Sequence, residues 1–412
     1  MNIANTGFAE AEPARRAGAT VRTIYAARAL RDLGDGFIAV LLPVYLTGLG
    51  LGAFEIGVVA TLALLGSALM TLAIGLLGSG WNRRKLLLAA SGLMVLTGLA
   101  FAASDNYALV LVVALIGTIN PSSGSVSIFV PLEHAALSGA VADRERTRMF
   151  ARYSLIGALA AAVGALGAAT PDFLATLGVS RPAALRAMFV AYAVLGLAGG
   201  FLYARIPADA TPAEDQPAAA LGPSRAIVYK LAALFSIDAF AGGFAVQSLV
   251  ALWLFAKFGL SLYAAGLFFF WSGVLAAFSF PVAAWLSSRI GLVNTMVFTH
   301  IPSSVCLILA AVAPTMETAL GLLLVRAALS QMDVPTRSSY VMAVVTPAER
   351  PAAASVTSVP RSLAAAASPA IAGALFAAGL QAWPLILCGA LKIVYDLALL
   401  WTFRHVRPPE ER

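Results

Sequence analysis

The chain has 412 residues, of which 60% are hydrophobic and only 11% are charged. Soluble domains carry about a quarter charged residues, so this composition excludes an ordinary soluble protein and indicates an integral membrane protein. The formal net charge of +7 does not indicate a nucleic-acid-binding protein, because the basic residues gather in short loops between apolar segments.

The N-terminal segment is polar, and neither an apolar stretch nor a small-residue cleavage site precedes Arg15, so we expect no cleaved signal peptide. A helix needs about 20 apolar residues to cross a bilayer. Segments of that length predict an all-α integral membrane protein with twelve transmembrane helices. In chain order the predicted spans are Tyr25–Leu46, Glu55–Leu77, Leu86–Ala103, Tyr107–Leu137, Met149–Ala169, Leu185–Ala204, Ile227–Phe255, Leu262–Leu286, Val293–Val312, Thr318–Val345, Ala352–Leu380 and Trp383–Phe403.

A segment rich in proline, alanine and acidic residues separates the sixth span from the seventh, which is typical of a linker. It predicts three parts: a six-helix bundle over residues 1–204, a cytoplasmic linker over 205–226, and a second six-helix bundle over 227–412.

Lysine and arginine are distributed unevenly between the two sets of loops. The loops on the side of the N-terminus hold most of them, and the other loops hold only Arg181, Arg186 and Lys257. Because cytoplasmic loops carry the excess of basic residues, we expect both termini in the cytoplasm and the chain in the cytoplasmic membrane.

The two halves also repeat each other. A shift of 209 residues places Gly34 on Gly243 and Gly57 on Gly266. Parallel repeats of six helices are typical of a large class of secondary transporters, in which the substrate site lies between the halves near the middle of the bilayer. The prediction is therefore two pseudo-symmetric six-helix bundles.

The loop after the second span reads GLLGSGWNRRK, and the loop after the eighth lies in AWLSSRIGL. The first resembles the loop motif G-x-L-a-D-R-x-G-R-R of the major facilitator superfamily, and the second resembles its half-motif. The matching residues are Gly75, Leu77, Arg83, Arg84, Leu286, Arg289 and Gly291. Both loops have serine, Ser79 and Ser288, where the family has the aspartate that helps to latch its halves together.

The resemblance covers essentially the whole chain and implies a transporter that works by alternating access. It also implies that the first and tenth helices line the central cavity. The fifth span reads SLIGALAAAVGALGAATP and lacks the Gly-Pro pair of the family's antiporters. Its glycines are also explained by close helix packing.

The tenth span contains charged residues, which are rare inside membranes and are functional candidates by default. Arg326, Asp333 and Arg337 are spaced to share one stripe of a helix. Pro335 removes a hydrogen bond to the carbonyl of Gln331, which is then free for a ligand. Asp333 is interpreted as a protonatable group facing the pathway. A permanent salt bridge that fixes helix packing is the structural alternative.

The first span contains two pairs at four-residue spacing, Arg28 with Asp32 and Arg31 with Asp35. Asp35 lies deepest and is flanked by glycines, which let a ligand or another helix approach. It is therefore a second candidate for proton coupling, and an interfacial ion pair is the alternative.

The fourth span carries Asn120, Ser122 and Ser123 around Pro121, a set that suits a substrate surface but also suits helix packing. The seventh span adds Asp238 as a proton-coupling candidate and Gln247 as a pathway candidate.

Glu133 follows Pro131 as Arg337 follows Pro335 in the second half. One hypothesis pairs Glu133 with Arg337 across the pseudo-twofold axis at the cytoplasmic gate. The other gate candidates are Arg83, Arg84 and Arg289.

The remaining polar residues suggest no enzyme chemistry. Lys392 and Asp396 are spaced for a structural ion pair in the last span, and His300 belongs to no histidine cluster. Cys306 and Cys388 lie in apolar runs and suggest neither a disulfide nor a metal site. Because no nucleotide-binding Gly-Lys-Ser/Thr loop is present, we expect no cofactor and a gradient as the driving force.

The sequence thus predicts a monomeric secondary transporter that exchanges protons for a drug or metalloid-like solute and exports it. Proton-coupled uptake of a small metabolite and a non-transporting sensor with the same fold are the alternatives. The expected partners are the solute, protons and the lipid bilayer, and not nucleic acid.

Overall fold

The structure is a computed structural model that describes residues 6–77, 81–122, 127–138, 143–207, 221–346 and 349–404. Within these ranges the secondary structure is helical and includes no strand. The helices of the first half are α1 (Thr6–Gly48), α2 (Ala53–Leu77), α3 (Arg83–Ala103), α4 (Tyr107–Ile116), α5 (Phe129–Ser138), α6 (Asp143–Leu166), the 3₁₀ turn η2 (Gly167–Ala169), α7 (Thr170–Thr176) and α8 (Arg181–Tyr203). Those of the second half are α9 (Arg225–Gly243), α10 (Gln247–Phe258), α11 (Leu262–Ile290), α12 (Leu292–Ala311), α13 (Met316–Ser330), α14 (Asp333–Val344), α15 (Arg350–Ala377) and α16 (Trp383–Phe403).

Among the described residues, 9 helical segments are long and apolar enough to cross a membrane. Large apolar side chains such as Phe201, Phe278 and Trp401 are exposed on the outside of the bundle, as a lipid environment favours. The other three predicted spans fall on α1 and on the pairs α4–α5 and α13–α14. The total of twelve remains the count that the sequence predicts.

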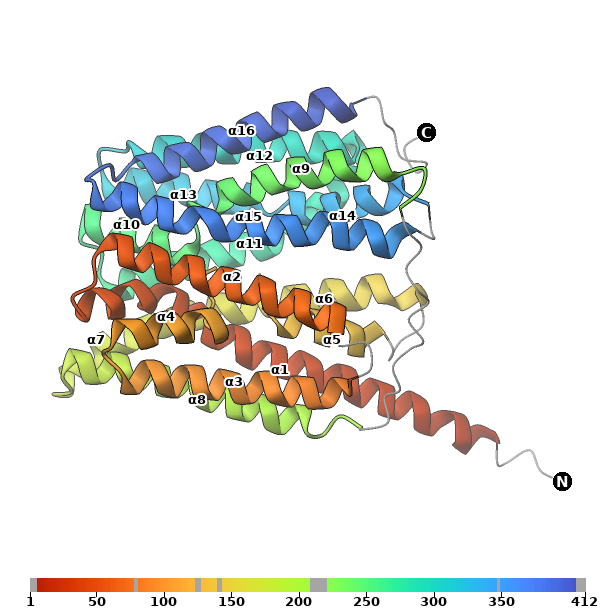
Figure 1. The fold of residues 1–412 in the computed structure, drawn as a ribbon, viewed down its shortest axis with the longest axis horizontal. Helices are drawn as coiled ribbons and strands as arrows, with labels where there is room; N and C mark the ends of the chain where they lie inside the picture. Colours follow the sequence, from red (N-terminus) through yellow and green to blue (C-terminus); the bar gives the residue numbers. More distant parts are fainter. Residues whose placement is uncertain are drawn as a thin grey trace.

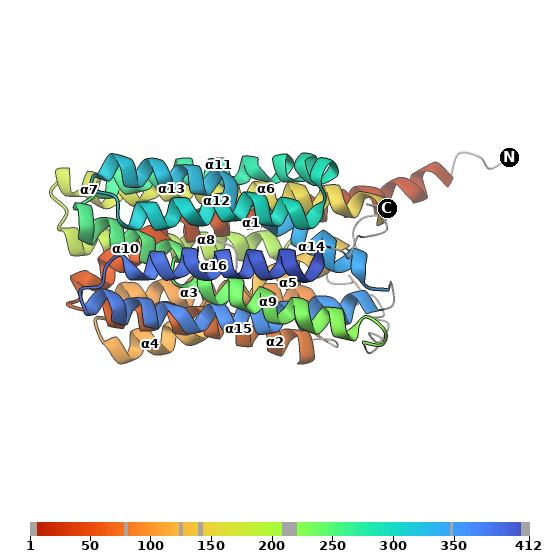
Figure 2. The ribbon, with the colours of Figure 1, turned by 90° about the horizontal axis from the view of Figure 1, so that it is seen from above.

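The helices run side by side along the length of the molecule (Figures 1 and 2). α1 begins and α16 ends at the same end of the bundle, called here the terminal end (right in Figure 1). Within the first half α1 packs on α6 and α8, and α3 packs on α8. Within the second half α9 packs on α15 and α16, and α12 packs on α13 and α16. The main contacts between the halves join α2 to α15, α6 to α11 and α1 to α10.

Three predicted spans are interrupted. The sequence indicates two of these breaks through Pro121 and Pro335, whereas the break in the seventh span was not predicted. The fourth span stops at Ile116 and resumes at Phe129, and the seventh stops at Gly243 and resumes at Gln247. The tenth breaks at Gln331, because Pro335 has no N–H to bind its carbonyl. Such breaks expose backbone groups near the middle of a bundle, where transporters bind their substrates.

The contact between α2 and α15 depends on glycine. A Cβ atom on Gly57 would lie 2.5 Å from the carbonyl oxygen of Pro369 and 2.9 Å from the Cα atom of Gly373. The two halves therefore approach each other with almost no side chain between their backbones at this point.

Candidate functional site

Each half of the protein contains one buried cluster of charged and phenolic side chains. The first-half network consists of Arg28, Arg31, Asp32, Asp35, Glu133, Tyr153, Tyr192 and Tyr203. The second-half network consists of Asp238, His300, Asp333, Arg337, Lys392 and Asp396. Charged side chains are costly in a membrane unless they are paired, so each network must satisfy its own members.

Glu133 is the centre of the first-half network and is 0% exposed. Its carboxylate lies 3.0 Å from Nη1 of Arg31. The hydroxyls of Tyr153 and Tyr203 both donate hydrogen bonds to it. α5 is thereby joined to α1, α6 and α8 through one side chain.

The guanidinium of Arg28 lies 2.6 Å from the carboxylate of Asp32, which confirms the pair predicted from the four-residue spacing. The second predicted pair, Arg31 with Asp35, is wrong. Arg31 turns to Glu133 and lies 3.5 Å from Asp32, because these carboxylates flank it and Asp35 is one turn deeper.

Asp35 is buried to 1% exposure and differs from every other carboxylate in the two networks. Within the part of the chain that the structure describes, no lysine, arginine or histidine lies within 4.0 Å of it. Its one hydrogen-bond contact is the hydroxyl of Tyr192, at 3.4 Å. That hydroxyl lies closer to the carbonyl oxygen of Thr118, at 3.0 Å, so it has a better acceptor elsewhere.

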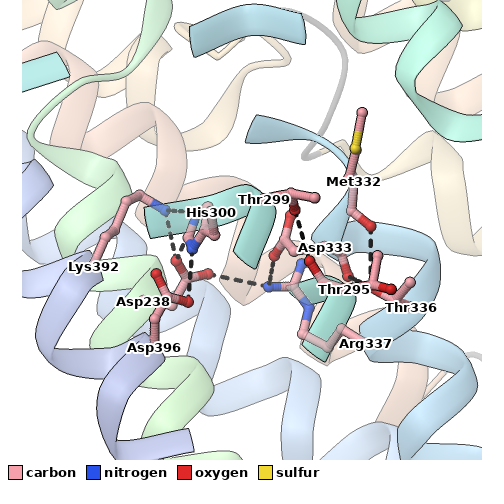
Figure 3. Close-up of polar contacts among 10 residues, drawn as sticks. All are labelled: Asp238, Thr295, Thr299, His300, Met332, Asp333, Thr336, Arg337, Lys392 and Asp396. Carbon is pink, nitrogen blue, oxygen red and sulfur yellow. Dashed lines mark hydrogen bonds and ion pairs between the residues drawn. The ribbon is translucent and has the colours of Figure 1, made fainter. Parts of the chain in front are cut away.

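Arg337 holds the second-half network together (Figure 3). Its Nη1 atom lies 2.9 Å from Asp333 and 3.1 Å from Asp238. The first contact confirms the pair predicted by spacing, and the second joins α14 to α9. The other oxygen of Asp238 lies 2.6 Å from Nζ of Lys392, so Asp238 has a cation on each side.

His300 belongs to this network, although the sequence assigned it no role. Its Nδ1 atom lies 3.0 Å from Asp396, and its Nε2 atom lies 3.3 Å from Nζ of Lys392. Since an ammonium group can only donate, Nε2 is assigned as the acceptor, and the ring proton is on Nδ1 facing Asp396. The pair predicted between Lys392 and Asp396 is therefore wrong, because each binds a partner on another helix instead (Figure 3).

The pathway candidates lie at the helix breaks. Oδ1 of Asn120 accepts a hydrogen bond from the backbone of Ser122, and the N–H of Ser248, next to Gln247, donates to the carbonyl of Pro121 at 3.0 Å. This last bond joins the break in the fourth span to the break in the seventh, and so joins the two halves. Ser123 lies outside the described residues.

Arg326 and Asp333 do not share a continuous helix, because the break at Gln331 places them on α13 and α14. Arg326 lies in the electrostatic range of Cys388 on α16 and forms no ion pair with a described residue. The expected stripe of three charges therefore reduces to the pair of Asp333 and Arg337.

The gate candidates make their contacts within their own halves. Arg83 donates to the carbonyl of Ala135 at 3.1 Å, and Arg289 lies over the ring of Trp285. Arg84 forms no hydrogen bond or ion pair with the described residues, and Ser79 lies outside them.

The hypothesis that Glu133 pairs with Arg337 is not met in this structure. Glu133 binds Arg31, and Arg337 binds Asp238 and Asp333. Each residue finds an opposite charge on a neighbouring helix of its own half, so neither needs a partner across the interface.

A cavity of about 660 Å³ lies at the end opposite the termini, away from both networks. It opens between the halves, because the ends of α1 and α8 line one side and the end of α10 lines the other. Its wall is mostly apolar, and the exposed ion pair of Asp105 with Arg186 lies at its edge.

Interrupted apolar helices with a buried ion network in each half define a multi-pass membrane transporter. A sequence profile of the Major Facilitator Superfamily matches residues 24–331, and the chain belongs to this family. An uncharacterized membrane protein of Saccharomyces cerevisiae is 23% identical over 422 aligned residues, which cover 94% of each chain.

Solved transporter structures share the fold at low sequence identity. A bacterial homolog of the human lysosomal transporter Spinster, inward-facing and occupied, has a TM-score of 0.69 at 14% identity and covers 93% of this chain and 96% of its own. The nucleoside transporter NupG has a TM-score of 0.70 at 14% identity, covering 94% and 99%. The human organic anion transporter MFSD10 has a TM-score of 0.63 at 17% identity, covering 94% and 99%.

Proposed function

We propose that this transporter is driven by protons and that Asp35 is the residue that takes up and releases them. Asp35 is buried and has no cationic neighbour within ion-pair distance, whereas Asp32 and Glu133 beside it are paired with arginine. An isolated ionised carboxylate in an apolar interior is strongly disfavoured, so a proton is the ligand that neutralises this group. Opening its surroundings to water in the other state of the cycle releases the proton.

Asp333 and Asp238 were also candidates for proton coupling, and their contacts support a different role. Arg337 binds both, and Lys392 binds Asp238 as well. A proton would have to compete with these cations. We therefore assign the two aspartates to holding α9, α14 and α16 in register.

The proposed substrate pathway runs between the halves at the helix breaks. Asn120 and Gln247 lie at two of these breaks, and the bond from Ser248 to Pro121 brings the breaks together. The cavity at the opposite end is proposed as the outer mouth of this pathway. Its position between the halves means that their movement would reshape it.

The direction and setting of transport follow the sequence prediction. The uneven distribution of lysine and arginine supports cytoplasmic termini and insertion in the cytoplasmic membrane. We propose export of a small drug-like or hydroxylated metalloid-like solute by a monomer. A thiolate-bound metalloid receives less support, because the described residues offer no group of three metal-binding side chains.

The test compares wild type with Asp35→Asn, and uses Glu317→Gln, an exposed glutamate outside both networks and outside the cavity lining, as the control. An efflux-deficient host expressing each form at equal membrane levels is challenged with cationic, neutral and anionic toxic compounds and with arsenite. We expect wild type and Glu317→Gln to protect against one class and Asp35→Asn to lose that protection. Greater sensitivity with wild type would indicate uptake in place of export.

Proteoliposomes then separate coupling from binding. For the compound identified, Asp35→Asn is expected to keep solute exchange but to lose accumulation driven by a pH gradient. Accumulation by Asp35→Asn equal to that of wild type would overturn the assignment of Asp35.

A further inference from the structure

One arginine next to the second-half network has no ion-pair partner among the residues that the structure describes. Arg361 of α15 lies in electrostatic range of Arg337, Asp238 and Asp333, and the strongest of these influences is the like charge of Arg337. Its Nε atom is buried and lacks a hydrogen-bond partner. None of the described carboxylates lies within 4.0 Å of its guanidinium.

The carboxylates nearby are already occupied. Asp238 is bound by Lys392 and Arg337, and Asp333 is bound by Arg337. Asp396, on the far side of the network, is bound by His300. Rearranging the network to serve Arg361 would therefore leave another cation without its partner.

Arg361 cannot escape to water along its own helix. It lies 11 residues after Arg350, the first residue of α15, which corresponds to about 16 Å at the rise of an α-helix. A buried arginine in a membrane protein faces an interior site by default, and it requires a negative partner there.

The position of α15 shows where that partner would come from. α15 packs on α9 within the second half and on α2 of the first half, so it forms part of the interface between the halves (Figures 1 and 2). Arg361 itself is partly exposed, which leaves room for a ligand to reach it.

We propose that Arg361 binds an anionic group of the transported solute, a carboxylate, sulfonate or phosphate, at the interface between the halves. The planar guanidinium presents paired donors that match two oxygens of such a group. Arg337 is engaged by its two aspartates, which leaves Arg361 as the donor for the solute. This inference rests on the proposed transport function and names its substrate class.

The first half contains a charge of the opposite sign that also has no ion-pair partner among the described residues. Among the described residues, Asp35 is a buried carboxylate without a cation, and Arg361 is a cation with a buried Nε atom and no carboxylate partner. A proton on Asp35 and an anion on Arg361 together add no net charge to the interior of the protein.

The test uses probes of similar size that differ in charge: benzoate, benzenesulfonate and phenyl phosphate as anions, benzamide as the neutral form and benzylamine as the cation. Purified full-length protein in proteoliposomes is exposed to each probe, and solute-induced currents and pH-gradient-driven flux are recorded. The variants are Arg361→Gln, Arg361→Lys and the control Arg225→Gln, whose arginine lies over the ring of Tyr229 away from the network.

We expect wild type and Arg225→Gln to respond to at least one anion and not to benzamide or benzylamine. Arg361→Gln should weaken the apparent affinity for that anion about tenfold or more, the effect of losing one strong charge-assisted hydrogen bond, and Arg361→Lys should restore part of it. Thermal unfolding of each variant shows whether it is folded.

A wild-type response that follows the neutral or cationic probe would overturn the anion site and leave the transport function standing. An anion response that a folded Arg361→Gln retains would do the same. A wild type that is silent to all the probes and shows no proton-driven flux would contradict the proposed function, and the anion site with it.

Discussion

Glu133 binds Arg31 at 3.0 Å, so an acid on the fourth span pairs with a base on the first. The second half shows the reverse arrangement at the corresponding helices, because Arg337 on the tenth span pairs with Asp238 on the seventh at 3.1 Å. The halves have kept the position of the ion pair and exchanged its signs. Each of these two pairs lies within one half, so neither has to break when the halves move against each other during alternating access.

Replacing the carboxylate of Glu133 by an amide should leave Arg31 buried with only the carboxylate of Asp32 nearby, and one of the two tyrosine hydroxyls without its acceptor oxygen. Breaking a buried pair by removing one partner typically costs about 3–5 kcal/mol. We expect Glu133→Gln to lower the unfolding free energy in detergent by about this amount. Arg186→Gln, which breaks an exposed pair, should have little effect. Equal effects of the two variants would show that Glu133 is not the centre of its network.

Arg337→Lys tests whether one guanidinium must bridge two aspartates. Lysine keeps the charge but is shorter than arginine, so its ammonium does not reach the position of the Nη1 atom that contacts both Asp238 and Asp333. We expect a loss of about 1.5–3 kcal/mol in unfolding free energy, the value of one hydrogen bond to a charged group. Arg289→Lys, at an exposed arginine over Trp285, is the control and should be neutral. Full stability of Arg337→Lys would mean that charge alone is sufficient.

The fold was largely predictable because long apolar segments and the pattern of basic loops depend on local sequence. Four-residue spacing identified the pairs Arg28–Asp32 and Asp333–Arg337 correctly. The same rule failed for Lys392–Asp396, because spacing shows which side chains share a helix face but not what a neighbouring helix offers.

The partners that sequence reasoning missed all come from other helices. His300 contacts Lys392 and Asp396 across the interface between α12 and α16, and Tyr153 and Tyr203 reach Glu133. A hydroxyl in an apolar span needs a partner when it is buried, so the tyrosines were a usable signal. Which carboxylate they bind depends on how α5, α6 and α8 pack together, and local sequence patterns do not predict that packing.

Gly57→Ala should disturb the closest approach of the two halves. The added methyl group would lie 2.5 Å from the carbonyl oxygen of Pro369, so α2 and α15 must separate. Overpacking of this kind costs about 1–3 kcal/mol. Because the contact joins the halves, we expect transport to slow as well. Gly92→Ala is the control, since a Cβ atom there has no neighbour within 4 Å. A Gly57→Ala protein with wild-type stability and flux would show that the interface has room.

Glu349, the residue before α15, should make the stability of the second half at its terminal end depend on pH. Hydrogen bonds from the hydroxyls of Thr346 and Ser224 lower the pKa of its carboxyl from 4.5 to about 2. Its Oε1 atom also accepts from the backbone of Gly222, at 2.5 Å, so the carboxylate ties the start of α9 to the loop before α15.

Because the pKa is lower in the folded state than in the unfolded state, Glu349 stabilises the fold fully above pH 4.5 and loses this effect as the pH falls toward 2. We therefore expect Glu349→Gln to unfold at a lower temperature than wild type near neutral pH. The difference should shrink between pH 4.5 and 2, because unfolded wild type takes up a proton there, whereas the folded protein takes it up only near pH 2. Glu317→Gln, at an exposed glutamate in the first turn of α13, should show no comparable difference. Only the charged form of Glu349 accepts all of these hydrogen bonds. A difference in unfolding temperature between wild type and Glu349→Gln that stays constant down to acid pH would therefore mean that the side chain acts through its shape and not its charge.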